Sequence, residues 1–150
     1  MTNAHLIEAL SSAIKKALSG VEFAEEYQRE PGELVVVNVF ENYLPENVFE
    51  ETSWLPFVLV ELLEVHDDLN AGSSTEIGLT LATFAFEGDG WKDAWHMVEL
   101  IRRELLIRRV LANRFRLKDL RWEVPGEQPR EFYFVTGRVT YDNYLPALQI

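Results

Sequence analysis

Two helix-like stretches enclose a run of three strand-like segments, and this order limits the folds open to the chain. In residues 3–18, apolar side chains recur at every fourth position, which is the spacing of one helix face. Segments 34–40, 57–65 and 75–86 are rich in the β-branched and aromatic residues that strands favour. A second apolar stripe, at mostly three- and four-residue steps, predicts a longer helix over 91–112.

Two further strands are expected after Asn113. Apolar residues alternate with charged ones around Leu120 to Val124, and a second alternation runs from Tyr133 to Tyr141. The sequence PGEQP at 125–129 predicts a turn between them. The order is therefore α-β-β-β-α-β-β, which favours an α+β fold: a mostly antiparallel sheet flanked by two helices. A chain of 150 residues fits one domain, 1–150.

Two connections carry residues of interest. Residues 66–74 (HDDLNAGSS) are expected to form a turn-rich surface connector. Residues 41–55 form a polar loop that carries the large apolar side chains of Tyr43, Phe49 and Trp54. We interpret these three as a contact surface for another molecule, and burial against the protein's own sheet is the alternative.

Charge is distributed very unevenly along the chain. Residues 1–90 hold 17 Asp and Glu against three Lys and Arg, whereas residues 91–150 hold 8 against 11, for a net charge of −11. Eight of the 14 basic residues lie between positions 102 and 121. They either form a solvated surface with weak pairs such as Glu99–Arg103, or meet an acidic surface on another subunit. The candidate interface residues are Arg102, Arg103, Arg108 and Arg109, the last two late in the second helix.

No catalytic motif is present. The chain has no cysteine, which excludes a disulfide scaffold, and it has no glycine-rich phosphate loop and no nucleophile motif. The one His-plus-carboxylate cluster is His66-Asp67-Asp68, and three adjacent residues point in different directions, so we expect no metal site. His96 and Glu99 share a helix face and are expected to be a surface pair. We expect no enzyme activity and no cofactor.

The overall acidity narrows the range of partners. A pI near 4.7 argues against general nucleic-acid binding, although a local basic stripe could line a channel through which DNA passes. An acidic binding module, such as an inhibitor or a DNA mimic, is an alternative function. The sequence shows no apolar run of membrane-spanning length and no signal-peptide pattern at its start, so we expect no membrane partner and a cytoplasmic protein.

Four stretches, in this order and spacing, resemble the tail terminator and minor tail proteins of long-tailed bacteriophages and prophages. They are LPFVLVELLEVHDD (55–68), EIGLTLATFAFEGD (76–89), GWKDAWHMVELIRRELLIRRVLANRFRL (90–117) and RWEVPGEQPREFYFVTGRVTYDN (121–143). Together they cover about half of the chain. None of the four is a catalytic signature.

The resemblance implies a structural role. Such proteins form a ring, typically of six subunits, that caps the tail tube, ends its polymerisation and docks to the head–neck connector. It implies the tail tube protein and the connector protein as partners, assembly in the host cytoplasm and a final place in the virion tail. Other neck proteins share a similar α+β build and are an alternative within this class.

Overall fold

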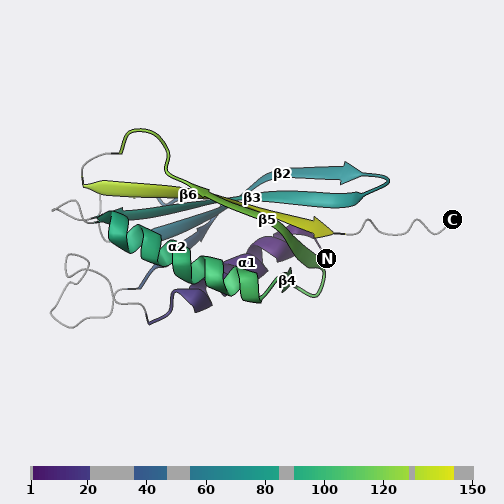
Figure 1. Cartoon of the computed structure of the whole chain (residues 1–150), viewed down its shortest axis with the longest axis horizontal. Helices are drawn as coiled ribbons and strands as arrows, with labels where there is room; N and C mark the ends of the chain where they lie inside the picture. Colours follow the sequence, from purple (N-terminus) through teal and green to yellow (C-terminus); the bar gives the residue numbers. More distant parts are fainter. Residues whose placement is uncertain (1, 21–35, 47–54, 85–89, 129–130, 144–150) are drawn as a thin grey trace.

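The protein has an α+β fold, as the sequence predicts, with two helices packed on one face of a six-stranded, mostly antiparallel sheet (Figure 1). The computed structural model describes residues 2–20, 36–46, 55–84, 90–128 and 131–143. Its elements in chain order are α1 (Asn3–Ala17), β1 (Asn38–Glu41), β2 (Phe57–Asp68), β3 (Gly72–Phe84), α2 (Gly90–Ile107), β4 (Val110–Leu111), β5 (Phe115–Glu123) and β6 (Phe132–Asn143).

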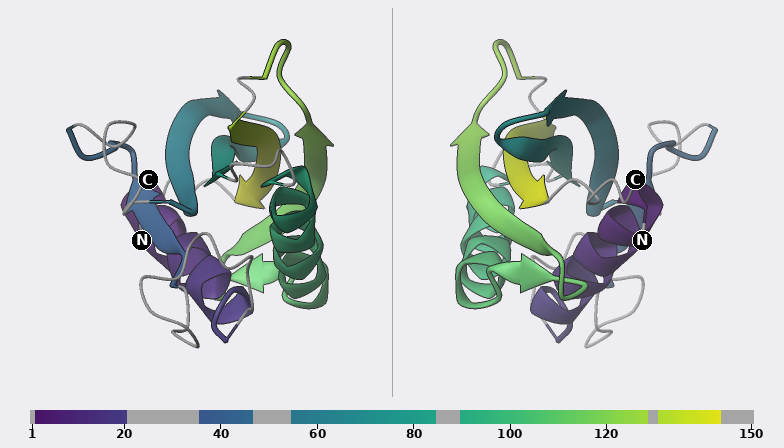
Figure 2. Two further views of the ribbon diagram at one scale, coloured as in Figure 1. Left: turned by 90° about the vertical axis from the view of Figure 1, so that its left-hand side faces the viewer. Right: turned by 90° about the vertical axis from the view of Figure 1, so that its right-hand side faces the viewer.

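The sheet order is β1-β2-β3-β6-β5-β4, so β3 and β6 lie at its centre. β1 runs parallel to β2, and the remaining neighbours are antiparallel. Seen end on, the sheet bends around the two helices, with β2 and β5 on opposite sides of the molecule (Figure 2). The central strands are therefore covered on both edges, and only the flanking strands have backbone groups that could pair with another chain.

The main core lies between the helices and one face of the sheet. Leu6, Leu10 and Ile14 of α1 and Ile101 and Leu105 of α2 are fully buried, as their helical spacing predicts. The sheet contributes alternate residues of each central strand, among them Ile77, Leu79, Val135, Val139 and Tyr141. Burial raises the pKa of the Tyr141 hydroxyl.

A smaller apolar cluster lies on the opposite face of the sheet, because its residues alternate with those of the main core along the same strands. Phe57, Ala82 and Phe134 are neighbours in register there. The rings of Phe84 and Phe132 pack beside them in a tilted arrangement with centroids 5.2 Å apart. This end of the sheet is thus apolar on both faces. The outer half of β2, by contrast, is exposed.

Three predicted boundaries are wrong. Residues 66–74 are not a long connector: the β2–β3 ladder continues to the pair Asp68–Gly72 and turns within 69–71. The first strand begins at Asn38, later than the predicted 34, and residues 34–35 lie outside the described part of the chain. The second helix ends at Ile107 because Val110 and Leu111 instead pair with β5, which buries Leu111.

Two left-handed residues produce the reversal after the second helix. Ala112 and Asn113 have φ angles of 51° and 57°, and the N–H of Arg114 donates to the carbonyl of Leu111 across them at 3.1 Å. This conformation is the turn that joins antiparallel strands, and asparagine tolerates it well. The turn returns the chain from α2 to the sheet and so places the basic residues 108–121 along one flank.

Gly137 of β6 is required by the close approach of an aromatic ring. Its register partner on β5 is Trp122, whose ring lies across the glycine. A Cβ atom at position 137 would lie 2.6 Å from Cζ3 of Trp122, which is closer than packing allows. The absence of a side chain at Gly137 therefore lets Trp122 cover the core.

We predict that Gly137→Ala lowers the free energy of unfolding by about 1–3 kcal/mol, because the added methyl must displace the indole ring. Urea denaturation would measure the change. Gly126→Ala is the matched control, since its Cβ would meet nothing within 4 Å, and it should stay within about 0.5 kcal/mol of the parent. Equal denaturation midpoints for the two variants would contradict this account of the Trp122 packing.

Candidate assembly surfaces

The outer half of β2 is an open strand edge in the part of the chain that the structure describes. β1 pairs only with Phe57–Val60 of β2. Asn42 extends this pairing by one step: its N–H donates to the carbonyl of Val60 at 2.7 Å, and its Oδ1 accepts from the N–H of Leu62 at 3.0 Å. Beyond Leu62, no described strand covers β2, and residues 62–68 are all exposed.

This segment, residues 62–68, is named here the acidic edge. Leu62, Leu63 and Val65 are 42%, 47% and 40% exposed, which is unusual for apolar residues within a strand. The charges of the segment are those of Glu64, Asp67 and Asp68, and it has no Lys or Arg. Exposed apolar area beside charges of one sign is typical of a surface that binds a partner of opposite charge.

Asp68 stabilises the tight turn at the end of this edge. Its Oδ1 accepts hydrogen bonds from the backbone N–H groups of Asn70 and Ala71 at 2.8 and 3.1 Å. These two bonds, with a smaller contribution from the charge of His66, hold the pKa of the Asp68 carboxyl below its ordinary value. Asp68 therefore remains ionised at neutral pH, and its contribution to the turn is lost only as the pH falls through that lowered pKa.

The opposite flank of the sheet is basic. It is named here the basic edge and comprises the exposed residues Ile107, at the end of α2, and Arg108, Arg109, Val110, Arg116, Lys118 and Arg121. The exposed carboxylates of Asp119 and Glu123 on β5 offset part of its positive charge. β3 and β6 separate it from the acidic edge. Among the described residues, the acidic edge and the basic edge therefore lie on opposite flanks of one sheet.

Internal ion pairs engage only part of the basic edge. Arg108 pairs with Glu104 at 3.5 Å, Lys118 lies 3.9 Å from Asp142, and Nε of Arg109 donates to the carbonyl of Leu106. Within the described residues, Arg116 and Arg121 have no ion pair. Exposed pairs of this kind contribute little to stability, so these cations remain available to a partner.

The structure places the predicted interface residues in different surroundings. Arg102 and Arg103 are exposed on α2, and Arg102 lies 4.0 Å from Glu99, the residue predicted to pair with Arg103. Arg108 and Arg109 are exposed but follow α2, a correction to their predicted place within the helix. Tyr43 is 84% exposed. Phe49 and Trp54 lie outside the described residues.

Sequence reasoning missed the exposed leucines of the acidic edge. Among the tryptophans, Trp95 and Trp122 pack against the core, whereas Trp91 is 48% exposed. Trp91 lies in the first turn of α2, next to Gly90, which is buried and accepts a hydrogen bond from Oγ1 of Thr83 on β3. The signal that could have revealed the acidic edge was the run ELLEVHDD, in which charges interrupt an otherwise apolar strand on both faces.

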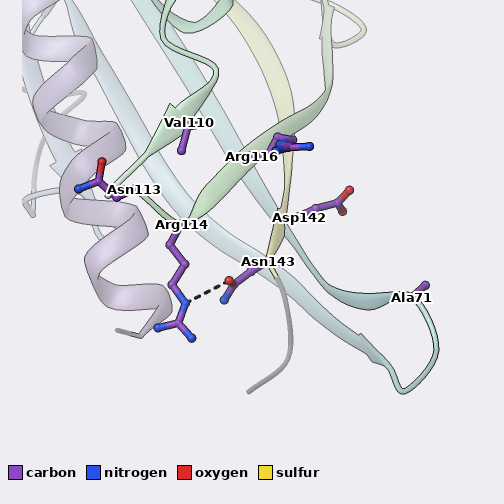
Figure 3. Close-up of a pocket in the computed structure, with 7 residues that line it drawn as sticks. All are labelled: Ala71, Val110, Asn113, Arg114, Arg116, Asp142 and Asn143. Atoms are coloured by element: carbon purple, nitrogen blue, oxygen red, sulfur yellow. Dashed lines mark hydrogen bonds between the residues drawn. The ribbon is translucent and has the colours of Figure 1, made fainter. Parts of the chain in front are cut away.

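A cavity of about 430 Å³ lies where the β4–β5 turn meets the end of β6. Its lining includes the side chains of Arg114, Arg116, Asp142 and Asn143, and the tip residue Ala71 of the β2–β3 hairpin (Figure 3). Nε of Arg114 donates to Oδ1 of Asn143 at 3.2 Å. Arg114 and Asn143 thus contact each other, and the described lining includes no pair of a nucleophile and a general base.

The His66-Asp67-Asp68 cluster lies on β2, where alternate residues point to opposite faces. His66 and Asp68 therefore face away from Asp67. No group of three potential metal ligands converges among the described residues. His96 and Glu99 are both exposed on α2, where Glu99 faces Arg102.

Comparisons with known proteins give distant likeness in structure and none in sequence. No protein-family model matches the chain, and no curated protein sequence matches it. Among solved structures, it is similar to a chain of the virion of a native gene transfer agent particle, with 15% identity and a TM-score of 0.49, covering 95% of this chain and 100% of that one. A likeness at this level does not establish a shared function. No helix in the described ranges is long and apolar enough to cross a bilayer.

We predict that metal removal leaves the protein unchanged. Chelation by EDTA should shift the melting temperature by about a degree or less, because the side chains of the His66-Asp67-Asp68 cluster point to opposite faces of a strand. Differential scanning fluorimetry with and without chelator would measure it. A drop of several degrees that added Zn²⁺ or Ca²⁺ reversed would mean that a metal is bound.

Proposed function

We propose that the chain is a structural subunit of a long-tailed phage or prophage. In this role it forms a ring, of about six subunits by the family resemblance, that caps the tail tube, ends its polymerisation and docks to the head–neck connector. The protein acts by assembly and catalyses no reaction. Its partners are copies of itself, the tail tube protein and the connector protein, and DNA only passes through the channel. It assembles in the host cytoplasm and resides in the virion tail.

One observation carries the self-assembly part of this proposal: the acidic edge and the basic edge lie on opposite flanks of one sheet. A closed ring needs a heterologous interface, in which two different patches of each subunit fit each other. A two-fold dimer would instead bring like patches together, and each edge carries charges that repel its own copy. This distribution of charge favours head-to-tail contact.

The exposed apolar residues beside the charges supply the attraction that charges alone do not. Leu62, Leu63 and Val65 accompany the carboxylates, and Ile107 and Val110 accompany the arginines. Charge complementarity sets register and partner choice, whereas burial of apolar area supplies most of the affinity. Both contributions are present on both edges, as a contact between them requires.

We predict concentration-dependent self-association that weakens with salt. Between low and high ionic strength the apparent dissociation constant should rise at least tenfold, because both edges are exposed and screened by ions. Sedimentation velocity over a wide concentration range would measure it, with and without tail-tube fragments. A strict monomer at high concentration that tube fragments also failed to recruit would exclude ring formation and favour the acidic binding module.

We predict that the double variant Arg108→Glu, Arg109→Glu folds normally and does not assemble. Both side chains are exposed, so the cost to the monomer should stay under about 1 kcal/mol, including repulsion between position 108 and Glu104. Like charges brought together across an interface cost several kcal/mol. Circular dichroism would report the fold, and ring formation on tail tubes would report assembly.

The control for this variant is Lys15→Glu, Lys92→Glu, which changes the net charge equally at exposed positions outside the two edges. It should assemble like the parent. If the arginine variant capped tails of normal length, the basic edge would be only a solvated surface. The interface would then be sought around Tyr43, Phe49 and Trp54.

A further inference from the structure

We propose that the two edges join by β-sheet pairing: the acidic edge of β2 in one copy pairs antiparallel with the free edge of β5, residues 118–123, in the next. The sheet then continues from subunit to subunit around the assembly. This inference rests on the proposed self-assembly and goes beyond it, because it names the strands, their direction and their register.

Free backbone groups on β2 point outward, away from β3. On β2, the carbonyl of Val60 and the N–H of Leu62 point outward to Asn42. In an antiparallel ladder, alternate residues direct their backbone N–H and C=O groups to opposite edges of the strand. When this alternation is followed through the bulge between Leu62 and Glu64, the N–H and C=O groups of Val65 and Asp67 also point outward, away from β3. The acidic edge thus offers two residues with free donors and acceptors at the spacing of a ladder.

The β5 edge offers the matching groups. The N–H of Leu117 points outward to the carbonyl of Arg109 at 2.7 Å, and β4 covers β5 no further. The same alternation, past the bulge between Leu117 and Asp119, turns the backbone groups of Leu120 and Trp122 outward. No described strand pairs with this side of residues 118–123.

The relative direction of β2 and β5 within one subunit determines how they would pair between subunits. Three antiparallel steps separate β2 from β5, so the two strands run in opposite directions within one subunit. Rotation about a ring axis lying roughly along the strands preserves strand direction in every copy. The β2 of one copy therefore meets the β5 of its neighbour antiparallel, which is also the more stable pairing.

Charge selects the register. The register that pairs both outward residues of each edge, Val65 with Trp122 and Asp67 with Leu120, places Glu64 against Glu123 and Asp68 against Asp119. With Val65 opposite Leu120 instead, one outward pair exchanges backbone hydrogen bonds. Glu64 then lies opposite Arg121, His66 opposite Asp119 and Asp67 opposite Lys118. Opposite charges that face each other across strands are stabilising, and like charges are destabilising. Two β2 edges would instead place the carboxylates of Glu64, Asp67 and Asp68 against their own copies. The second copy of this chain, seated head to tail, is therefore the occupant that the edge fits.

Cysteine cross-linking tests the pairing, and the chain has no native cysteine to interfere. His66 and Asp119 are exposed, and their backbone groups point away from the new interface, so their Cβ atoms would approach to about 4.5–5.5 Å. A mixture of full-length His66→Cys and Asp119→Cys chains should form a disulfide-linked dimer under mild oxidation. A chain with both substitutions should form a ladder of bands that ends at the size of the ring.

Leu69→Cys replaces His66→Cys in the matched control. Leu69 is exposed at the hairpin tip, three residues or about 10 Å farther along the strand, beyond disulfide reach of position 119. It should cross-link at least tenfold less. A chain that self-associates in sedimentation but shows no link between positions 66 and 119 would overturn the pairing and leave ring formation standing. Efficient linking of His66→Cys to itself would also overturn it.

A second variant tests the backbone directly. Val65→Pro removes an outward N–H and leaves the β2–β3 ladder intact, since proline is tolerated on an edge strand. Val65→Thr retains the N–H and is the control. With both folded by circular dichroism, the proline variant should weaken self-association at least tenfold and the threonine variant about twofold or less. Equal weakening would mean that the side chain, and not the strand pairing, makes the contact.

Discussion

Burial of the two helix stripes against one face of the sheet, α2 on β3 and β6 and α1 beside it on β1 and β2, is the interaction on which the rest of the structure depends. Ile14 of α1 and Ile101 of α2 are fully buried there together with Leu79 and Val139 of the central strands. This packing uses one face of the sheet, and it fixes β3 and β6 at the centre. The open backbone of the described sheet is therefore confined to its two flanks, where the charges of opposite sign also lie.

The flanks are exposed in a way that a monomer does not require. Natural sheets protect open edges with charged residues, and the acidic edge has such residues, but it combines them with Leu62, Leu63 and Val65 in contact with solvent. The basic edge repeats this combination with the opposite sign through Arg116, Arg121 and Val110. Because the acidic and basic edges carry opposite charges, each edge disfavours pairing with its own copy. Each favours pairing with the other edge of a neighbouring copy.

The parts of the fold that the sequence predicted are those governed by local periodicity. The helix stripes, the alternation in β6 and the turn after Pro125 have patterns that burial of one face imposes on the sequence itself. The errors occur where distant contacts override local signals. Residues 66–68 look like a loop because they are polar, yet pairing with Gly72 to Ser74 extends the strand through them. Val110 continues the helical stripe, yet pairing with Arg116 places it in a strand.

The sequence by itself determined the α+β class, the buried stripes of the two helices, the uneven distribution of charge and the lack of catalytic motifs, because each depends on residue type and short-range spacing. Only the tertiary structure decided that the charges face opposite ways. The strand order inserts β3 and β6 between β2 and β5, and strand order depends on contacts between residues far apart in the chain. The same order left the outer backbone of Val65 and Leu120 without a described partner strand, which no local pattern in the sequence indicates.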